Sequence, residues 1–269
     1  MKYEQHLESC ETLNNIWKNK SKYLIIHYAC ESFYEKSMAK TPRITAIAIR
    51  SFESGQTHSF SMHQTAELLN IDTSDITTKY DEIEFEMLKM FSIFLQSSKE
   101  KYWIHWNMRD GNYGFQAILH RYKILRNKFD PNGQSSPEML EINDDNKYDL
   151  SLLLIRKYGS GYIGNPRMVM LAKENKMSMK DLLTGSEEAS AFENGEFHKL
   201  LLSTLSKVTL FSNILQKTID NDLKTQSRKS DIYDSWKIRV INYITKNPYG
   251  VIGFPITTTI LGYILGKYF

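Results

Sequence analysis

The chain has 269 residues, of which 41% are hydrophobic, and its 34 Lys and Arg nearly balance 31 Asp and Glu, leaving a formal net charge of +3. This composition suffices for one main folded domain with an appendage, and the net charge does not by itself indicate nucleic-acid binding. Two cysteines, Cys10 and Cys30, exclude a disulfide framework and indicate a reducing compartment. The N-terminus "MKYEQHLESCETL" is charged where a secretory signal needs an apolar core, so we expect no export signal.

The N-terminal half predicts a mixed α/β fold with an α+β tendency. Runs rich in β-branched and aromatic residues predict strands, "ESGQ" predicts a hairpin turn between the second and third of them, and apolar stripes at helical spacing predict helices. In chain order the predicted elements are a helix at 3–18, strands at 22–29, 43–52 and 57–63, a helix at 81–98, a strand at 101–106 and a helix at 113–128.

The C-terminal half predicts helices after a polar excursion. Residues 127–147 contain Pro-Asn-Gly and Ser-Pro and are expected to form a long loop. The longest helix is predicted over 194–219, and 230–246 places Ile232, Trp236, Val240 and Tyr243 on one face. We therefore divide the chain into a ligand-sensing domain (1–223), an amphipathic juxtamembrane helix (224–246) and a transmembrane segment (247–269).

The predicted transmembrane segment begins with "NPYGVIGFPITTTILGYILG" (247–266), which contains no charged residue. As a helix it would cover about 30 Å, the hydrocarbon thickness of a bilayer. Gly262 and Gly266 have the spacing that lets membrane helices approach closely, and Thr257, Thr258 and Thr259 need polar partners or water. Basic residues precede the segment, so the positive-inside rule predicts that the large domain lies in the cytoplasm. The alternative is a terminal hydrophobic element buried in the core.

The bend "KYWIHWNMRDGNYGFQAILHRY" (101–122) concentrates aromatic and basic residues. Aromatic rings that stack bases, together with cations that meet phosphates, are typical of single-strand binding sites. The candidate ligand contacts are Trp106, Asn107, Arg109, Tyr113 and Arg121, of which Arg109 and Tyr113 are preferred because they stand on the turn itself. Core packing accounts for Trp103 and Phe115 equally well.

Three short motifs give the chain a resemblance to a nuclease family. "YACESF" ends the first strand, "HWNMRDGNYGF" precedes a helix, and "FHKLLLSTLSKV" lies on a late helix. Over residues 22–220 the chain resembles the ribonuclease H-like 3′–5′ exonucleases of the proofreading type. That resemblance implies a ribonuclease H-like mixed sheet with a helical C-terminal part, and a site in which four carboxylates hold two divalent metals.

The chain departs from that motif set at most metal-binding positions. Glu31 matches the family's Glu, but Ala29 and Ser203 stand where the family has Asp, and Asp110 is one place early. Two Mg²⁺ ions need several anionic oxygens, so we expect no metal, no cofactor and no hydrolysis. The alternative is a membrane-tethered, Mg²⁺-dependent 3′–5′ exonuclease that uses Glu31, Asp110 and His198 with a third carboxylate, Asp149 or Glu196.

A nuclease-like domain followed by a membrane helix is similar in layout to the channel effector of the Hailong type of bacterial anti-phage system. This resemblance implies an ion channel in the bacterial inner membrane that is gated by an oligonucleotide. It further implies a single-stranded deoxyadenylate oligomer as the ligand, a nucleotidyltransferase that makes this signal, and a homo-oligomer, taken as a tetramer. One helix per chain cannot form a pore, so a ring of subunits is required. A tail-anchored scaffold without a ligand is the third interpretation.

Overall fold

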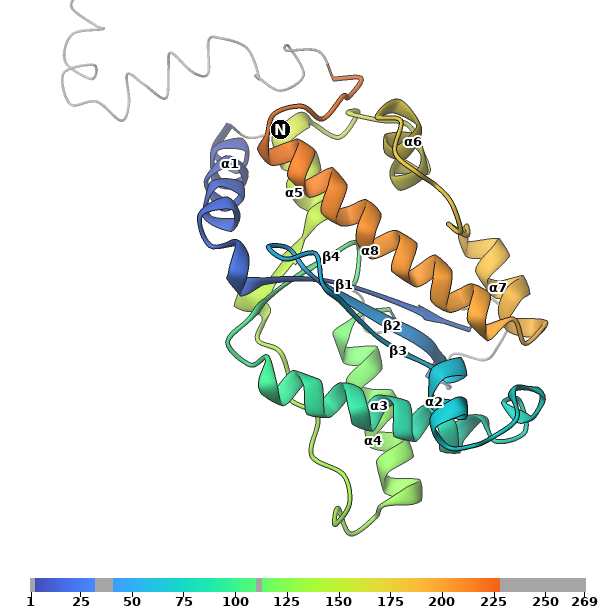
Figure 1. Cartoon of the computed structure of the whole chain (residues 1–269). Helices are drawn as coiled ribbons and strands as arrows, with labels where there is room; N and C mark the ends of the chain where they lie inside the picture. Colours follow the sequence, from blue (N-terminus) through green and yellow to red (C-terminus); the bar gives the residue numbers. More distant parts are fainter. Residues whose placement is uncertain (1–2, 32–40, 110–112, 228–269) are drawn as a thin grey trace, which may run out of the picture.

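The computed structural model describes residues 3–31, 41–109 and 113–227, which fold around one five-stranded mixed sheet (Figure 1). The strands are β1 (Tyr23–Cys30), β2 (Ile44–Ser51), β3 (Thr57–Ser61), β4 (Tyr102–His105) and β5 (Lys147–Asp149). The helices are α1 (Tyr3–Lys18), α2 (Met62–Leu68), α3 (Tyr80–Ser97), α4 (Phe115–Phe129), α5 (Leu150–Tyr158), α6 (Arg167–Glu174), α7 (Gly185–Glu193) and α8 (Phe197–Ile219).

The strand order is β3-β2-β1-β4-β5. The hairpin neighbours β1, β2 and β3 are antiparallel, while β4 is parallel to β1 and β5 is parallel to β4. Parallel neighbours need crossover connections, and the chain supplies them as α3 between β3 and β4 and as α4 between β4 and β5. The carboxyl ends of β1, β4 and β5 therefore lie at the same edge of the sheet.

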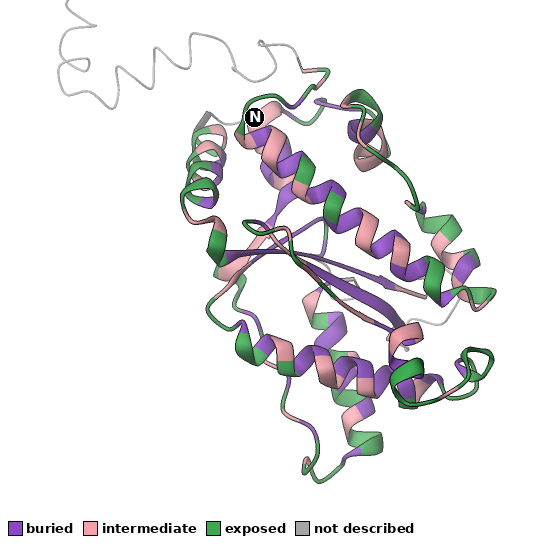
Figure 2. Cartoon of the chain, in the orientation of Figure 1, coloured by how far each residue is buried: buried purple, intermediate pink, exposed green. Residues whose placement is uncertain are grey.

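Alternate residues of β1 belong to two separate hydrophobic cores, one on each face of the sheet. Leu24, Ile26 and Tyr28 pack on the face covered by α2, α3 and α4, whereas Tyr23 and Ile25 pack on the face covered by α1, α5 and α8. Figure 2 shows the central strands buried and the outer surfaces of the helices exposed. Since β1 is covered on both sides, its sequence is an almost continuous apolar run rather than an alternating one.

The predicted elements agree with the structure over most of the described chain. The helices at 3–18, 81–98 and 113–128, the four strands, the "ESGQ" hairpin and the long α8 are confirmed within a few residues at each end. The expectation that only helices follow the loop at 127–147 was wrong, because the short strand β5 starts at Lys147. The helix predicted from residue 113 begins at Phe115, with Gly114 as its N-cap.

Among the described residues, no helix combines the length and the apolar character needed to cross a bilayer. The predicted juxtamembrane and transmembrane segments, with Thr257, Thr258, Thr259, Gly262 and Gly266, lie outside the described residues, as does Asp110. The division of the chain at 223 and 246 therefore stays a prediction.

Candidate functional site

Two hollows lie at the edge where β1, β4 and β5 end. The β1 hollow, of about 330 Å³, lies between the end of β1 and residues of α6, α7 and α8. The β4/β5 hollow, of about 580 Å³, lies at the ends of the other two strands beside α1 and α5. Crevices at the carboxyl ends of parallel strands are the usual ligand sites of open α/β sheets. We therefore build the candidate site from these two hollows.

A buried ion pair occupies one wall of the β1 hollow. The Lys207 Nζ of α8 lies 2.6 Å from the Glu188 Oε1 of α7, and the two side chains are only 5% and 14% exposed. The Ser203 hydroxyl, one turn before Lys207, donates to the same Glu188 oxygen at 2.9 Å and accepts the Leu183 N–H. Ala29 lies on the same hollow at the end of β1. A lysine ammonium thus neutralises the carboxylate that faces this end of the sheet.

A buried imidazole and a tyrosine ring also line the β1 hollow. His27 is 7% exposed, and its Nε2 has no hydrogen-bond partner among the described residues. Burial and the neighbouring Lys207 hold the pKa of His27 well below its usual range, so the ring is neutral. Tyr113 stacks on Tyr28 with its hydroxyl donating to the Tyr28 carbonyl oxygen, so it enters the hollow from the bend. Met168, Val169 and Leu183 make the opposite wall apolar.

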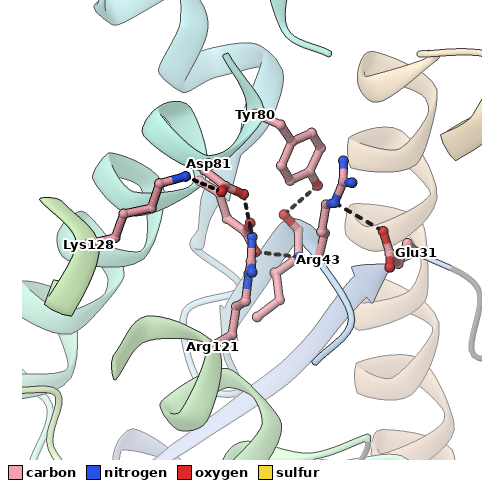
Figure 3. Close-up of polar contacts among 8 residues, drawn as sticks. Glu31, Arg43, Tyr80, Asp81, Arg121 and Lys128 are labelled. Atoms are coloured by element: carbon pink, nitrogen blue, oxygen red, sulfur yellow. Dashed lines mark hydrogen bonds and ion pairs between the residues drawn. The ribbon is translucent and has the colours of Figure 1, made fainter. Parts of the chain in front are cut away.

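Glu31, the single carboxylate that matches the nuclease pattern, is neutralised from the opposite side. Its Oε2 lies 3.3 Å from the Arg43 Nε, next to the start of β2, as Figure 3 shows. The Arg43 guanidinium lies over the Tyr80 ring, 5.0 Å from its centroid, and the Tyr80 hydroxyl donates to the Ile44 carbonyl oxygen. The position of Arg43 is therefore fixed by α3, and Glu31 faces a fixed guanidinium.

The β4/β5 hollow presents Arg109 from the bend. The Arg109 Nε lies 2.6 Å from the Asp149 Oδ2, and the Arg109 Nη2 donates to the Asn107 Oδ1 at 2.7 Å. Asp149 is buried, and its other oxygen caps α5 by accepting the Leu152 N–H. The Arg109 side chain, in contrast, is 51% exposed. Two partners thus orient a guanidinium that still reaches solvent, beside Lys147 and Arg156 on the same hollow. Such a preset fork suits a phosphate or a carboxylate.

His105 forms the floor of this second hollow. It is 3% exposed, and its Nδ1 accepts the Met108 N–H at 3.1 Å, which leaves the ring proton on Nε2. Burial lowers the pKa of His105 to about 4, against the opposing effect of the Asp149 carboxylate. The side chain is therefore neutral at pH 7 and acts in the structure as an acceptor for the turn after β4.

Four of the predicted site residues that the structure describes line neither hollow, and one of them, Asn107, accepts a hydrogen bond from Arg109. Trp106 is 9% exposed and stacks on Phe211 with ring centroids 5.4 Å apart, so it packs in the core instead of offering a face to a base. His198 is exposed at the start of α8 and contacts the His63 ring of α2. Arg121 is paired with the carboxylates of Asp81 and Glu84. The structure thus brings together Glu31 with Tyr113, and Arg109 with Asn107.

Arg121 belongs to a buried network between α3 and α4 (Figure 3). Its Nε donates to both Glu84 oxygens at 3.0 Å, and its Nη2 also contacts Asp81, which in turn accepts from Lys128. Glu84 is fully buried and accepts the Ile44 N–H at 2.7 Å. Burial raises the pKa of Glu84 to about 7, although Arg121 pulls it down. With these donors committed, Arg121 joins helices instead of meeting a ligand.

Sequence reasoning did not single out Lys207, Glu188 or His27. Lys207 falls at helical spacing between Thr204 and Phe211, both buried in α8. A charged residue at a core position of a helix indicates a buried partner, and this signal is readable from the sequence. The partner was not readable, because Glu188 lies on a short polar helix that gives no sign of facing the sheet.

No protein-family model, curated protein or solved structure matches the chain. Within residues 3–31, 41–109 and 113–227, no group of three or more His, Cys, Asp or Glu side chains is arranged to hold a metal ion.

Proposed function

We propose that the chain is a membrane effector whose N-terminal domain binds a single-stranded oligonucleotide at the carboxyl edge of its sheet without cleaving it. The mixed five-stranded sheet with helices on both faces supports the interpretation of this domain as ribonuclease H-like. The main support for binding without cleavage is the Lys207–Glu188 ion pair at the end of β1, beside Ala29.

The charges at this edge argue against phosphodiester hydrolysis by metal ions. Two divalent cations need several carboxylate oxygens that carry uncompensated charge. Here three carboxylates at the ends of the strands are each paired with a cation of the chain: Glu188 with Lys207, Glu31 with Arg43, and Asp149 with Arg109. Binding of a metal would have to displace these partners, two of which are themselves buried or held by stacking.

The two hollows are complementary to the two parts of a nucleotide. The half-exposed Arg109 offers donors for a phosphate in the β4/β5 hollow, where Lys147 and Arg156 are paired with Asp144 and Glu8. The β1 hollow has apolar walls and one buried ring nitrogen, His27 Nε2, that can exchange a hydrogen bond with a base. Arg109 lines one hollow and Tyr113 the other, so two residues close in the sequence belong to both parts of the proposed site.

The membrane part of the proposal rests on the sequence. Twenty residues without charge at 247–266 support a bilayer-crossing helix, and Thr257–Thr259 support a wet interface in a ring of subunits, with a tetramer as the working assumption. The effector would then be an anti-phage ion channel gated by the oligonucleotide. Deoxyadenylate as the base, and a nucleotidyltransferase as the source of the signal, come from the resemblance in layout alone.

One experiment separates this function from the exonuclease alternative. The full chain in detergent is incubated with 5′-labelled single-stranded DNA and Mg²⁺ or Mn²⁺, and the products and the bound fraction are measured together. We expect intact DNA in a bound fraction that Arg109→Ala lowers. Lys199→Ala is the control, because Lys199 is similarly exposed (55% against 51%) but lies outside both hollows. A product ladder that disappears in Glu31→Gln would instead establish the exonuclease.

A further inference from the structure

A third hollow, of about 670 Å³, lies beside α1 and is separate from the two hollows of the proposed oligonucleotide site. It opens where α1 packs against α5, beside the end of α8 (Figure 1). His6, Cys10 and Trp17 of α1 line it together with Lys157 and Tyr158 of α5. A nucleophile, a base, a cation and an aromatic wall therefore share one cavity. None of them takes part in the proposed oligonucleotide site.

The geometry of His6 suits it to accept a proton from Cys10. The two residues are one helical turn apart, and the His6 Nε2 lies 3.7 Å from the Cys10 Sγ. The His6 Nδ1 lies 2.9 Å from the Lys157 carbonyl oxygen. Because a carbonyl can only accept, the ring proton lies on Nδ1 in the neutral ring, and the Nε2 lone pair faces the thiol. A nucleophile next to a base that a third group orients is the common arrangement of activated thiols.

Lys157 adds a positive charge near the same sulfur. Its Nζ donates to the Thr218 carbonyl oxygen and to the Asn221 Oδ1, which hold the ammonium at the cavity wall. Burial lowers the pKa of Lys157, and its electrostatic interaction with Cys10 opposes this shift. The hollow thus holds the Lys157 ammonium, which a carboxylate of a reagent can meet, together with the Asp220 carboxylate at its rim.

The second cysteine provides an internal comparison. Cys30 lies at the end of β1 in the β1 hollow, and burial, with Glu188 and Glu31 nearby, raises the pKa of its thiol well above the usual range. No imidazole hydrogen-bonds Cys30 among the described residues. The two thiols of one chain therefore differ in the groups beside them, because an imidazole lies next to Cys10 and two carboxylates lie near Cys30.

We propose that Cys10 is a reactive thiol that forms mixed disulfides with small, carboxylate-bearing disulfides of the glutathione type. In the reaction, the His6 Nε2 takes the thiol proton, and the Cys10 sulfur attacks one sulfur of the reagent. The new S–S bond forms as the reagent's own S–S bond breaks, and the departing thiolate takes the proton back from His6. Cys10 is oxidised and the released half of the reagent is reduced, so no further oxidant is needed.

Glutathione disulfide and intact-protein mass spectrometry test this proposal on the full chain in detergent. We expect the wild type and Cys30→Ser to gain one glutathione at equal rates, and Cys10→Ser to gain none in the folded state. His6→Asn keeps a donor for the Lys157 carbonyl but loses the base, so it should react about tenfold more slowly or worse. Modification of folded Cys10→Ser at the wild-type rate, or an unchanged rate in folded His6→Asn, would overturn the proposal.

The urea-unfolded wild type keeps the test decisive if a variant does not fold. Unfolding removes His6 and Lys157 from the neighbourhood of Cys10 and leaves the intrinsic reactivity of the thiol. We expect Cys10 to react at least about tenfold faster in the native chain than in the unfolded chain, a lower bound, since a positioned base typically contributes about a hundredfold or more. A native rate equal to or below the unfolded rate would contradict the inference.

Discussion

Lys207 of α8 and Glu188 of α7 form a buried ion pair, with Nζ and Oε1 2.6 Å apart, against the carboxyl end of β1. Removing one member of such a pair leaves an uncompensated charge in a poorly solvated place. We expect Lys207→Met to lower the free energy of unfolding by about 3 kcal/mol. The double variant Glu188→Gln, Lys207→Met should recover most of this loss, because it leaves no charge behind. Urea denaturation of the four proteins gives the coupling energy.

The exposed pair Lys199–Glu196 on the same helix provides the control for that cycle. Since both of its side chains reach solvent, Lys199→Met should change the free energy of unfolding little. Equal effects of Lys207→Met and Lys199→Met would show that the buried pair contributes no more to the free energy of unfolding than the exposed pair.

Binding of single-stranded DNA should depend on salt through Arg109. Each phosphate engaged on a single strand contributes about 0.7 to the slope of log affinity against log salt concentration. Arg109→Ala should therefore weaken binding and make the slope shallower by about 0.7. Fluorescence anisotropy at several salt concentrations measures both quantities. An unaltered slope together with an unaltered affinity would place the phosphate contacts elsewhere.

His105 should make the domain less stable in mild acid. Its pKa in the folded state is about 4, below the value of about 6.5 of an unfolded chain. As the pH falls from 6.5 to 4, the unfolded state binds a proton that the folded state does not, so the free energy of unfolding decreases. The loss is at most about 3 kcal/mol, since one pKa unit corresponds to about 1.4 kcal/mol.

Glu84 has the opposite tendency in an overlapping range, because its raised pKa of about 7 favours the folded state when the carboxyl is protonated. The His105 effect is therefore measured as the difference between the wild type and His105→Gln at each pH. This difference should shrink as the pH falls from 6.5 to 4. A difference that stays constant over this range would show that His105 titrates normally in the folded protein.

Arg121 should contribute to the stability of the folded domain and not to ligand binding. Arg121→Met leaves the fully buried Glu84 without its main cation, and we expect the free energy of unfolding to decrease by about 3 kcal/mol or more. Lys128→Met is the matched control, because Lys128 contacts the same network through Asp81 but is 56% exposed. Thermal melting of both variants checks the contrast. If Arg121→Met melts like the wild type yet fails to bind DNA, the residue is a ligand contact after all.

The C-terminal segment should determine membrane association and toxicity. A truncation after Lys246 should be released from the membrane, and Gly262→Leu should weaken association between copies, because helices in lipid depend on close packing more than on hydrophobicity. Growth and membrane potential of cells expressing the wild type and both variants provide the measurement. The pore-forming anchor is excluded if the truncation stays bound to the membrane or if all three proteins behave alike.

The sequence predicts the sheet and its helices well because strong local signals encode them. Apolar runs such as "YLIIHYA" can only be buried strands, and stripes such as that of α3 can only cover a sheet. β5 is missed because it has three residues, and only its register with β4 makes it a strand. A pairing of this kind depends on distant residues and leaves no local pattern.

The candidate site is less readable from the sequence, because the same residue types serve as contacts and as core. Trp106 and Arg109 are three residues apart in one bend, yet one stacks on Phe211 inside the protein and the other reaches solvent. Arg121 had a readable signal, since it lies at helical spacing between the buried Ile118 and Leu125. Its carboxylate Glu84 has the same kind of position on α3, between the buried Tyr80 and Leu88. Two opposite charges on core faces of consecutive helices predict a buried pair.

The position of β1 in the middle of the sheet has a consequence for folding kinetics. Its pairing with β2 joins residues close in the chain, such as Ile26 and Ile49, whereas its pairing with β4 joins Leu24 to Trp103 across α3. Contacts between distant residues cost more loop-closure entropy before they contribute, so the hairpins have the advantage in forming first. Substitutions in β2 should then slow refolding, while substitutions in β4 should mainly speed unfolding. The edge that carries both hollows would be completed last, when β4 and β5 dock onto a meander that already exists.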